Sequence, residues 1–277
     1  MEGYILIELK SVSGSLGSGN VENVSVRLPN GKTYGVFSPC YADSVALLSL
    51  ISGARTPTGG TVLVGGFDLH REAKQARRGI GYLPARLLPD EALTPIEYLM
   101  AIADARELPY EKTLRHVHEF LELADLAGKK ECLISNLSGG EKRALCLLQL
   151  LLGNPETLVL TSPLSGLTPK EAQKIRSLIA YFSQTHTVFL CTPSTRDLTE
   201  MCDEILVLKS GTLKTVVSAN DESLKAELSA PLTEASPAPE AEANAPSSNR
   251  ARAILKLLMQ KGGDCEVLDT DEKEDKS

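Results

Sequence analysis

A capped helix followed at once by a buried strand constrains this chain most, and both lie within residues 135–169. Ser138 and Glu141 have the spacing of a capping box, which opens a helix. The stretch at 144–152 is apolar nearly all round, which predicts that this helix lies inside a core. Residues 158–160 show no alternation of polarity, as in a central strand of a parallel sheet. Helix-like and strand-like segments alternate along the chain, which favours the α/β class.

The composition fits one large domain and argues against several functions. A chain of 277 residues can bury one sizeable core beside a smaller lobe or tail. The formal net charge of −7 argues against general binding to nucleic acid or to anionic membranes. The cysteines are scattered without close pairing, which favours buried, reduced thiols in the cytosol over disulfides or a metal site. They are Cys40, Cys132, Cys146, Cys191, Cys202 and Cys265.

Local patterns near the start of the chain predict further elements. Alternating residues at 5–9 and 24–28 predict two strands, and the Ser/Gly-rich piece at 11–20 predicts a loop between them. Residues 33–37 predict a third strand, and residues 69–78 a polar helix.

The capped helix also carries a family resemblance. Its first residues, Leu137, Ser138, Gly139, Gly140 and Glu141, resemble the signature sequence of ATP-binding cassettes, the ATPase subunits of ABC transporters. Residues 153–169 resemble the block that follows this signature, and residues 93–99 are similar to exporter-type cassettes in particular. The resemblance covers residues 1–218. It implies a P-loop NTPase (RecA-like) α/β core with an antiparallel β lobe, and a helical lobe at about 90–152.

The residues that hydrolyse ATP in this family are missing at the matching positions. Thr161 and Ser162 stand where the family has the aspartate that binds Mg²⁺ and the glutamate that activates water. The remaining losses are Ala85 for a glutamine, Thr168 for a loop aspartate and Pro193 for a histidine. A hydroxyl at neutral pH replaces neither a general-base carboxylate nor an anionic metal ligand. We therefore expect no hydrolysis and no metal at the chain's own site.

The phosphate-binding loop is degenerate as well. The family pattern G-x-x-x-x-G-K-[ST] cradles phosphates with backbone N–H groups and a lysine. The matching residues are Ser38, Pro39, Cys40, Tyr41, Ala42, Asp43, Ser44 and Val45. Ser44 occupies the lysine position, and Asp43 would repel a phosphate by about 3 kcal/mol per unit charge. We expect Asp43 to cap the following helix and so to close the pocket with its own side chain.

The intact signature leaves a role outside the chain's own site. In the family two cassettes pair head to tail, and the signature of one faces the ATP that the other binds. The resemblance therefore implies a heterodimer in which Leu137 to Glu141 complete the site of an intact partner cassette, with ATP and Mg²⁺ only at that shared site. Ser138 and Glu141 equally form a capping box that could persist for the helix alone. Two alternatives stay open, a weak non-standard ATPase and a nucleotide-independent regulatory or scaffold subunit.

The chain outside the cassette pattern predicts little regular structure. Residues 219–249 are rich in Pro, Ala, Ser and Glu, which predicts a disordered linker. Within residues 250–277, the part at 250–260 could form one amphipathic helix, and the end is an acidic tail. The first residues lack a signal-peptide layout, and no apolar run approaches the roughly 18 residues of a membrane span. We expect a cytoplasmic protein that reaches the membrane through an integral permease subunit.

Overall fold

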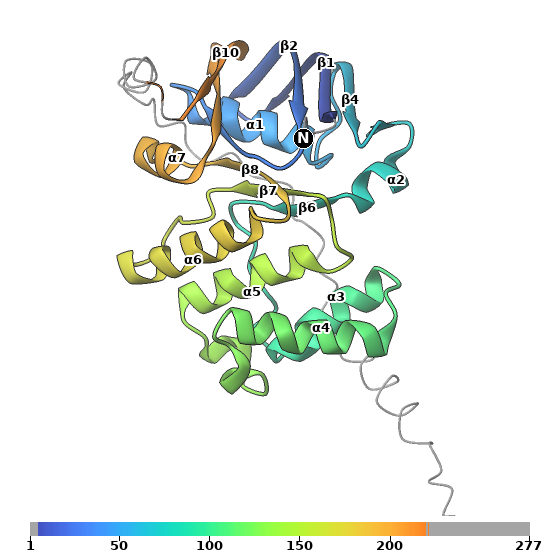
Figure 1. Cartoon of the computed structure of the whole chain (residues 1–277), viewed down its shortest axis with the longest axis vertical. Coiled ribbons are helices and arrows are strands. Elements are labelled where there is room, and N and C mark those ends of the chain that lie inside the picture. Colours follow the sequence, from blue (N-terminus) through green and yellow to red (C-terminus); the bar gives the residue numbers. More distant parts are fainter. Residues whose placement is uncertain (1–4, 220, 222–277) are drawn as a thin grey trace, which may run out of the picture.

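Two sheets and a helical lobe make up the described part of the chain (Figure 1). The computed structural model describes residues 5–219 and residue 221. Nearly all of the predicted linker, the amphipathic segment at 250–260 and the acidic tail lie outside the described residues. Within the described part, no helix combines the length and the apolar character needed to cross a membrane.

The larger sheet has six strands in the order β10-β9-β3-β8-β7-β6, and only β10 runs antiparallel to its neighbour. The predicted strands at 33–37 and 158–160 are β3 and β7, and every residue of both is buried. The parallel strands end at the same edge, which is where α/β proteins place their ligands. The strands are β3 (Thr33–Phe37), β6 (Ile80–Leu83), β7 (Thr157–Thr161), β8 (Thr187–Cys191), β9 (Glu204–Lys209) and β10 (Thr212–Ser218).

The smaller sheet is antiparallel, in the order β2-β1-β4-β5. The loop predicted at 11–20 is wrong, because β1 and β2 continue through it and turn only at residues 17 and 18. Val12 and Leu16 point into the core and are nearly unexposed, so the burial of alternate side chains outweighs the Ser/Gly composition. The strands are β1 (Ile5–Leu16), β2 (Gly19–Pro29), β4 (Gly59–Val64) and β5 (Phe67–Asp68).

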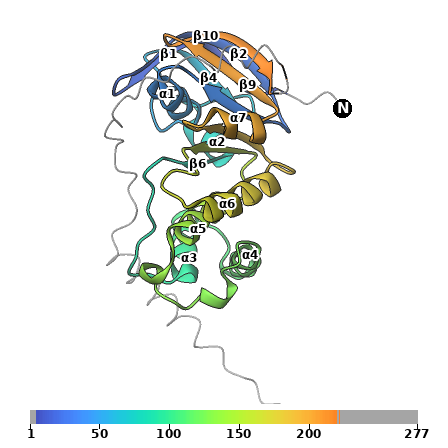
Figure 2. The ribbon, with the colours of Figure 1, turned by 90° about the vertical axis from the view of Figure 1, so that its left-hand side faces the viewer.

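The helices divide between the sheets and the lobe (Figures 1 and 2). α3, α4 and α5 pack together as the helical lobe, and α6 lies between this lobe and the larger sheet. The predicted polar helix at 69–78 begins only at residue 73, because the Asp68 carboxylate accepts the N–H groups of His70 and Arg71 in a turn. The helices are α1 (Tyr41–Ile51), α2 (Ala73–Arg78), α3 (Pro95–Ala105), α4 (Tyr110–Leu123), α5 (Gly139–Leu151), α6 (Pro169–Phe182) and α7 (Thr195–Met201), with 3-10 turns at Ala127–Lys129 and Ile134–Asn136.

The buried helix and its capping box are confirmed. α5 begins after Ser138, whose hydroxyl accepts the N–H of Glu141 while the Glu141 carboxylate accepts the N–H of Ser138. Leu145, Leu147 and Leu148 are fully buried in a core that joins α5 to the sheet and to the rest of the lobe. The fold therefore fixes the amino-terminal end of α5 firmly, and that end carries the signature-like residues.

Candidate functional site

The ends of β3, β7 and β8 meet at the site where the family pattern would place a nucleotide. Tyr41, the first residue of α1, directs its hydroxyl across this site. The Tyr41 hydroxyl lies 2.5 Å from the Ser162 hydroxyl and 3.4 Å from the Cys191 sulfur. The Tyr41 side chain thus connects the predicted phosphate loop to the ends of β7 and β8.

The predicted phosphate loop is largely helical. α1 starts at Tyr41, so only residues 38–40 separate it from β3. None of residues 38–45 has a positive φ. The Asp43 N–H donates to the Cys40 carbonyl at 3.0 Å, and the Cys40 N–H donates to the Ser38 hydroxyl at 3.2 Å. These N–H groups are paired inside the chain, whereas a phosphate loop directs them towards its ligand.

The predicted role of Asp43 as the helix cap is wrong. The cap position belongs to Cys40, and Asp43 is the third residue of the helix and is buried. Its carboxylate accepts the Asn20 N–H at 2.9 Å and the Ser38 hydroxyl at 3.0 Å. Without glycine at Tyr41 and Asp43 nothing favours an open, left-handed loop, and the helix extends one turn towards β3. The Asp43 carboxylate still lies inside the predicted phosphate loop, where Asn20 and Ser38 donate to it in place of the N–H groups that a helix cap would accept.

The β1–β2 hairpin covers the other side of the same loop. Gly19, the first residue of β2, lies so close to α1 that a β-carbon added to it would stand 2.1 Å from the Ala42 carbonyl oxygen. The next residue, Asn20, donates its backbone N–H to Asp43. The hairpin and the loop are therefore in direct backbone contact.

The remaining positions of the nucleotide site do not fit Mg-ATP. Ser44 and Thr161 are buried, and within the described chain their hydroxyl oxygens have no hydrogen-bond partner. Ser162 has a strained φ of 47° and is held by Tyr41. Ala85 contributes only its carbonyl, which accepts from Arg143, and Pro193 is exposed. No carboxylate stands where a metal or an attacking water would need one, and the described residues hold no cluster of three metal-ligating side chains.

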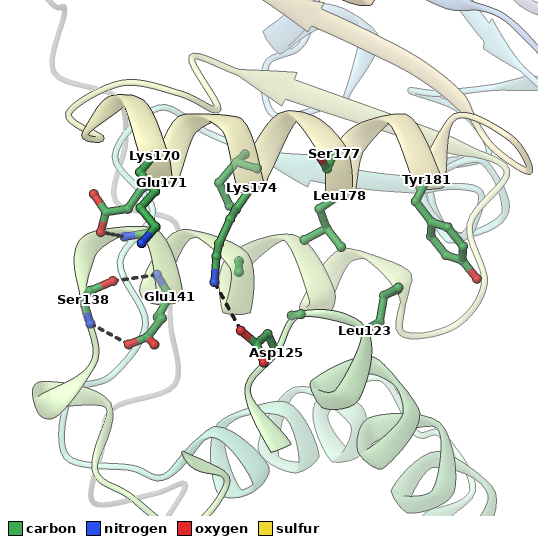
Figure 3. A pocket seen from close by; sticks show the side chains of 14 residues that line it. Leu123, Asp125, Ser138, Glu141, Lys170, Glu171, Lys174, Ser177, Leu178 and Tyr181 are labelled. Carbon is green, nitrogen blue, oxygen red and sulfur yellow. Dashed lines mark hydrogen bonds and ion pairs between the residues drawn. The ribbon is translucent and has the colours of Figure 1, made fainter. Parts of the chain in front are cut away.

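The signature residues have a different environment. Ser138 and Gly139 are exposed at the end of α5, whereas Leu137 and Gly140 are buried. The Gly140 N–H donates to the Glu171 carboxylate at 2.9 Å (Figure 3). An anionic oxygen of the chain itself therefore occupies one N–H group of the helix end.

Glu171 was not among the predicted site residues, although the sequence carries a signal for it. It stands three residues after Thr168, and the two form the capping box of α6. Thr168 donates both its N–H and its hydroxyl to the Glu171 carboxylate, at 3.0 and 2.8 Å. The loop residue at the family's aspartate position thus caps α6, and Glu171 joins α6 to the signature.

The pKa of Glu171 is lowered to about 2 by the hydrogen bonds from Gly140 and Thr168. Because the folded-state pKa lies below the ordinary 4.5, the carboxylate stabilises the fold above pH 4.5. That contribution is lost as the pH falls from 4.5 towards 2.

Replacing this carboxylate should therefore destabilise the chain only where it is ionised. We expect Glu171→Gln to unfold at a lower urea concentration than the natural chain at pH 7. The difference should shrink steadily as the pH falls below 4.5. Urea denaturation at a series of pH values measures this, and a difference independent of pH would contradict the role of the charge.

The Tyr41 hydroxyl should contribute measurably to stability. We expect Tyr41→Phe, which keeps the ring and removes the bond to Ser162, to lower the free energy of unfolding by about 0.5–1.5 kcal/mol. Tyr110→Phe is the matched control, because the Tyr110 side chain is exposed on α4. Equal urea midpoints for both variants would show that the Tyr41 bond does not hold the loop to β7.

Comparison with known proteins identifies the family. The family model described as "ABC transporter" matches residues 21–165. The chain therefore belongs to the ABC transporter family, as an ATP-binding cassette.

It is 30% identical over 212 residues to Nod factor export ATP-binding protein I of Rhizobium meliloti, a match that covers 75% of this chain and 62% of that protein. It is 28% identical over 197 residues to methionine import ATP-binding protein MetN of Geobacillus kaustophilus, over 69% of this chain and 58% of that protein. The chain thus spans about three fifths of these relatives.

Solved structures confirm the fold. A nucleotide-free ATP-binding cassette from an ABC transporter superposes with a TM-score of 0.69 at 18% identity, over 81% of this chain and 95% of the other. A dimeric cassette in a post-hydrolysis state, bound to ADP and Pi, superposes with a TM-score of 0.66 at 21% identity, over 78% and 100%. The predicted α/β cassette fold is therefore confirmed.

Proposed function

We propose that this chain is a non-hydrolytic cassette subunit of an ABC transporter, and that its signature completes the ATP site of an intact partner cassette. The observation that carries the proposal is the contrast between two ends of one fold. The phosphate loop is folded into α1 and connected to β7 by Tyr41, whereas Ser138 and Gly139 are exposed at the end of α5. Because the phosphate loop is filled by the chain's own side chains, the signature is the part of the chain that would still contact a nucleotide.

The chemistry of the helix end supports contact with a phosphate. The α5 amino terminus already holds an anionic oxygen, from Glu171, on the Gly140 N–H. A phosphate of the partner's ATP would take the place of this carboxylate and add the Ser138 hydroxyl. ATP and Mg²⁺ would therefore bind only at the shared site.

The relatives support a transporter as the setting of the proposed heterodimer. They are named for the export of Nod factor and the import of methionine, so we place this chain in a transporter without assigning a substrate. It would lie on the cytoplasmic side and reach the membrane through a permease subunit. The segment at 86–89 is suited to that contact, because Leu88 is 70% exposed.

One observation favours a second function, a nucleotide-independent regulatory subunit. In this chain the Glu171 carboxylate accepts the Gly140 N–H and also caps α6. The Gly140 N–H therefore has a hydrogen-bond partner without any ligand. In that case an intact cassette would not need the signature.

Phosphate release separates the proposed non-hydrolytic subunit from a weak ATPase. We would measure it for the full chain alone, for an intact cassette co-purified with it from the native source, and for their mixture. The proposal expects no release by the chain alone and a higher rate in the mixture than for the cassette alone. Turnover by the chain alone would favour a weak ATPase instead.

A further inference from the structure

Two adjoining hollows lie beside α6 on the side of the helical lobe. The first, of about 510 Å³, lies between α5, α6 and the end of α4, and Figure 3 shows its lining. The second, of about 490 Å³, lies between α4 and the end of α6. Leu123 and Tyr181 line both hollows, so the two adjoin and are described together as one depression. We call this depression the α4–α6 groove.

The groove exposes apolar side chains to solvent. Tyr181 is 53% exposed and Leu123 is 39% exposed, and both belong to the small set of large exposed hydrophobic residues in the described chain. Ala144, Ile175 and Leu178 extend the apolar lining inwards. Exposed apolar side chains gathered in one hollow are typical of a binding surface.

The free charges at the α4 end of the groove are acidic. Glu119 and Glu122 line the second hollow, are exposed, and form no salt bridge with any described residue. Lys174, which lines the first hollow, is paired with Asp125 at 3.2 Å. Lys170 stands at the other end, beside the signature. An occupant of the α4 end should therefore be apolar on one side and basic.

The chain contains a segment of this chemistry outside the described residues. Residues 250–261 include four cations and no acid. Ile254, Leu255 and Leu258 have the spacing that places apolar side chains on one face of a helix. The cations are Arg250, Arg252, Lys256 and Lys261.

The connection is long enough for this segment to reach the groove. Residues 222–249 separate it from Asp221 and can span at most roughly 90 Å. A domain of about 220 residues has a radius of gyration of roughly 17 Å. Every point on the surface of the cassette therefore lies within reach.

We propose that residues 250–261 bind in the α4–α6 groove of their own chain as an amphipathic helix. The apolar face would cover Leu123 and Tyr181, and the cations would face Glu119 and Glu122. This proposal does not depend on the proposed function, because the segment would cover the α4 end of the groove and leave the signature residues at the other end uncovered.

The natural absence of tryptophan allows a direct test in the full chain. Tyr181→Trp would place the only tryptophan of the chain in the groove, where it can be excited selectively. We expect its emission to be shifted to the blue and protected from acrylamide. Adding Leu255→Asp and Leu258→Asp should lower the docking equilibrium constant by about tenfold or more and expose the tryptophan.

The matched control is the pair Ala253→Asp and Gln260→Asp, which adds the same charge on the opposite helical face. The tryptophan should be better protected in the control than in the protein with Leu255→Asp and Leu258→Asp. Circular dichroism should show an unchanged fold in both proteins. A tryptophan equally exposed in all three proteins would overturn the proposal. Protection that survives Leu255→Asp and Leu258→Asp, or that depends on protein concentration, would assign the groove to another occupant and overturn it as well.

Discussion

A mixture of an intact partner cassette with the Ser138→Asp variant should hydrolyse ATP roughly a thousandfold more slowly at the shared site than the mixture with the natural chain. A carboxylate about 4 Å from a phosphate charge costs about 4 kcal/mol at an effective dielectric constant near 20. Each 1.4 kcal/mol is about a tenfold change in rate. Because aspartate caps a helix as well as serine does, the helix end should still form, with some loss of stability because the new carboxylate lies beside that of Glu171.

The control for this variant is Ser135→Asp, which adds the same charge at an exposed position three residues earlier. Its mixture should retain the natural rate, and it should unfold at the natural urea midpoint, while circular dichroism should show that both variants are folded under the assay conditions. Ser138→Arg should also abolish the stimulation, with some loss of stability because the cap is lost. Full stimulation by Ser138→Asp would contradict the proposed role of the signature and favour the regulatory function.

Gly19→Ala should destabilise the chain by about 1–3 kcal/mol or more, because its β-carbon would stand 2.1 Å from the Ala42 carbonyl oxygen. The atoms that the β-carbon would meet are all backbone, so no flexible side chain can move aside. The contact between Gly19 and Ala42 covers the predicted phosphate loop. Because Gly19→Ala disturbs this contact, it should also make the loop more accessible to solvent. Urea denaturation measures the first effect, and hydrogen exchange of the Asn20 amide measures the second.

Gly128→Ala is the matched control, because nothing lies within 4 Å of its added β-carbon. It should leave the stability within about 0.5 kcal/mol of the natural chain. If Gly19→Ala were equally harmless, the hairpin would not press on the loop as described.

The elements that the sequence predicts well are those specified by neighbouring residues. Ser138 and Glu141 cap α5 through bonds three residues apart, and the apolar run after them places the helix in the core. The strand β7 follows from an unbroken buried run. The family pattern supplied the rest of the cassette fold, including the antiparallel lobe.

The features that the sequence did not predict depend on contacts between distant residues. Tyr41 and Ser162 are 121 positions apart in the sequence. The residues of the loop alone therefore could not predict the contact that Tyr41, the first residue of α1, makes with Ser162. Glu171 reaches Gly140 across 31 positions. The early β1–β2 hairpin was hidden because its serines and glycines resemble a loop, while its burial depends on packing against α1.

Calorimetric titration of Mg-ATP into the purified full chain shows whether its own nucleotide site is closed. The loop at 38–45 pairs the N–H groups of Cys40 and Asp43 within the chain, lacks a lysine and contains the buried Asp43 carboxylate. We predict no saturable binding up to about 1 mM nucleotide, the upper range of cellular substrate affinities. Saturable, magnesium-dependent binding of one ATP per chain would contradict a closed site.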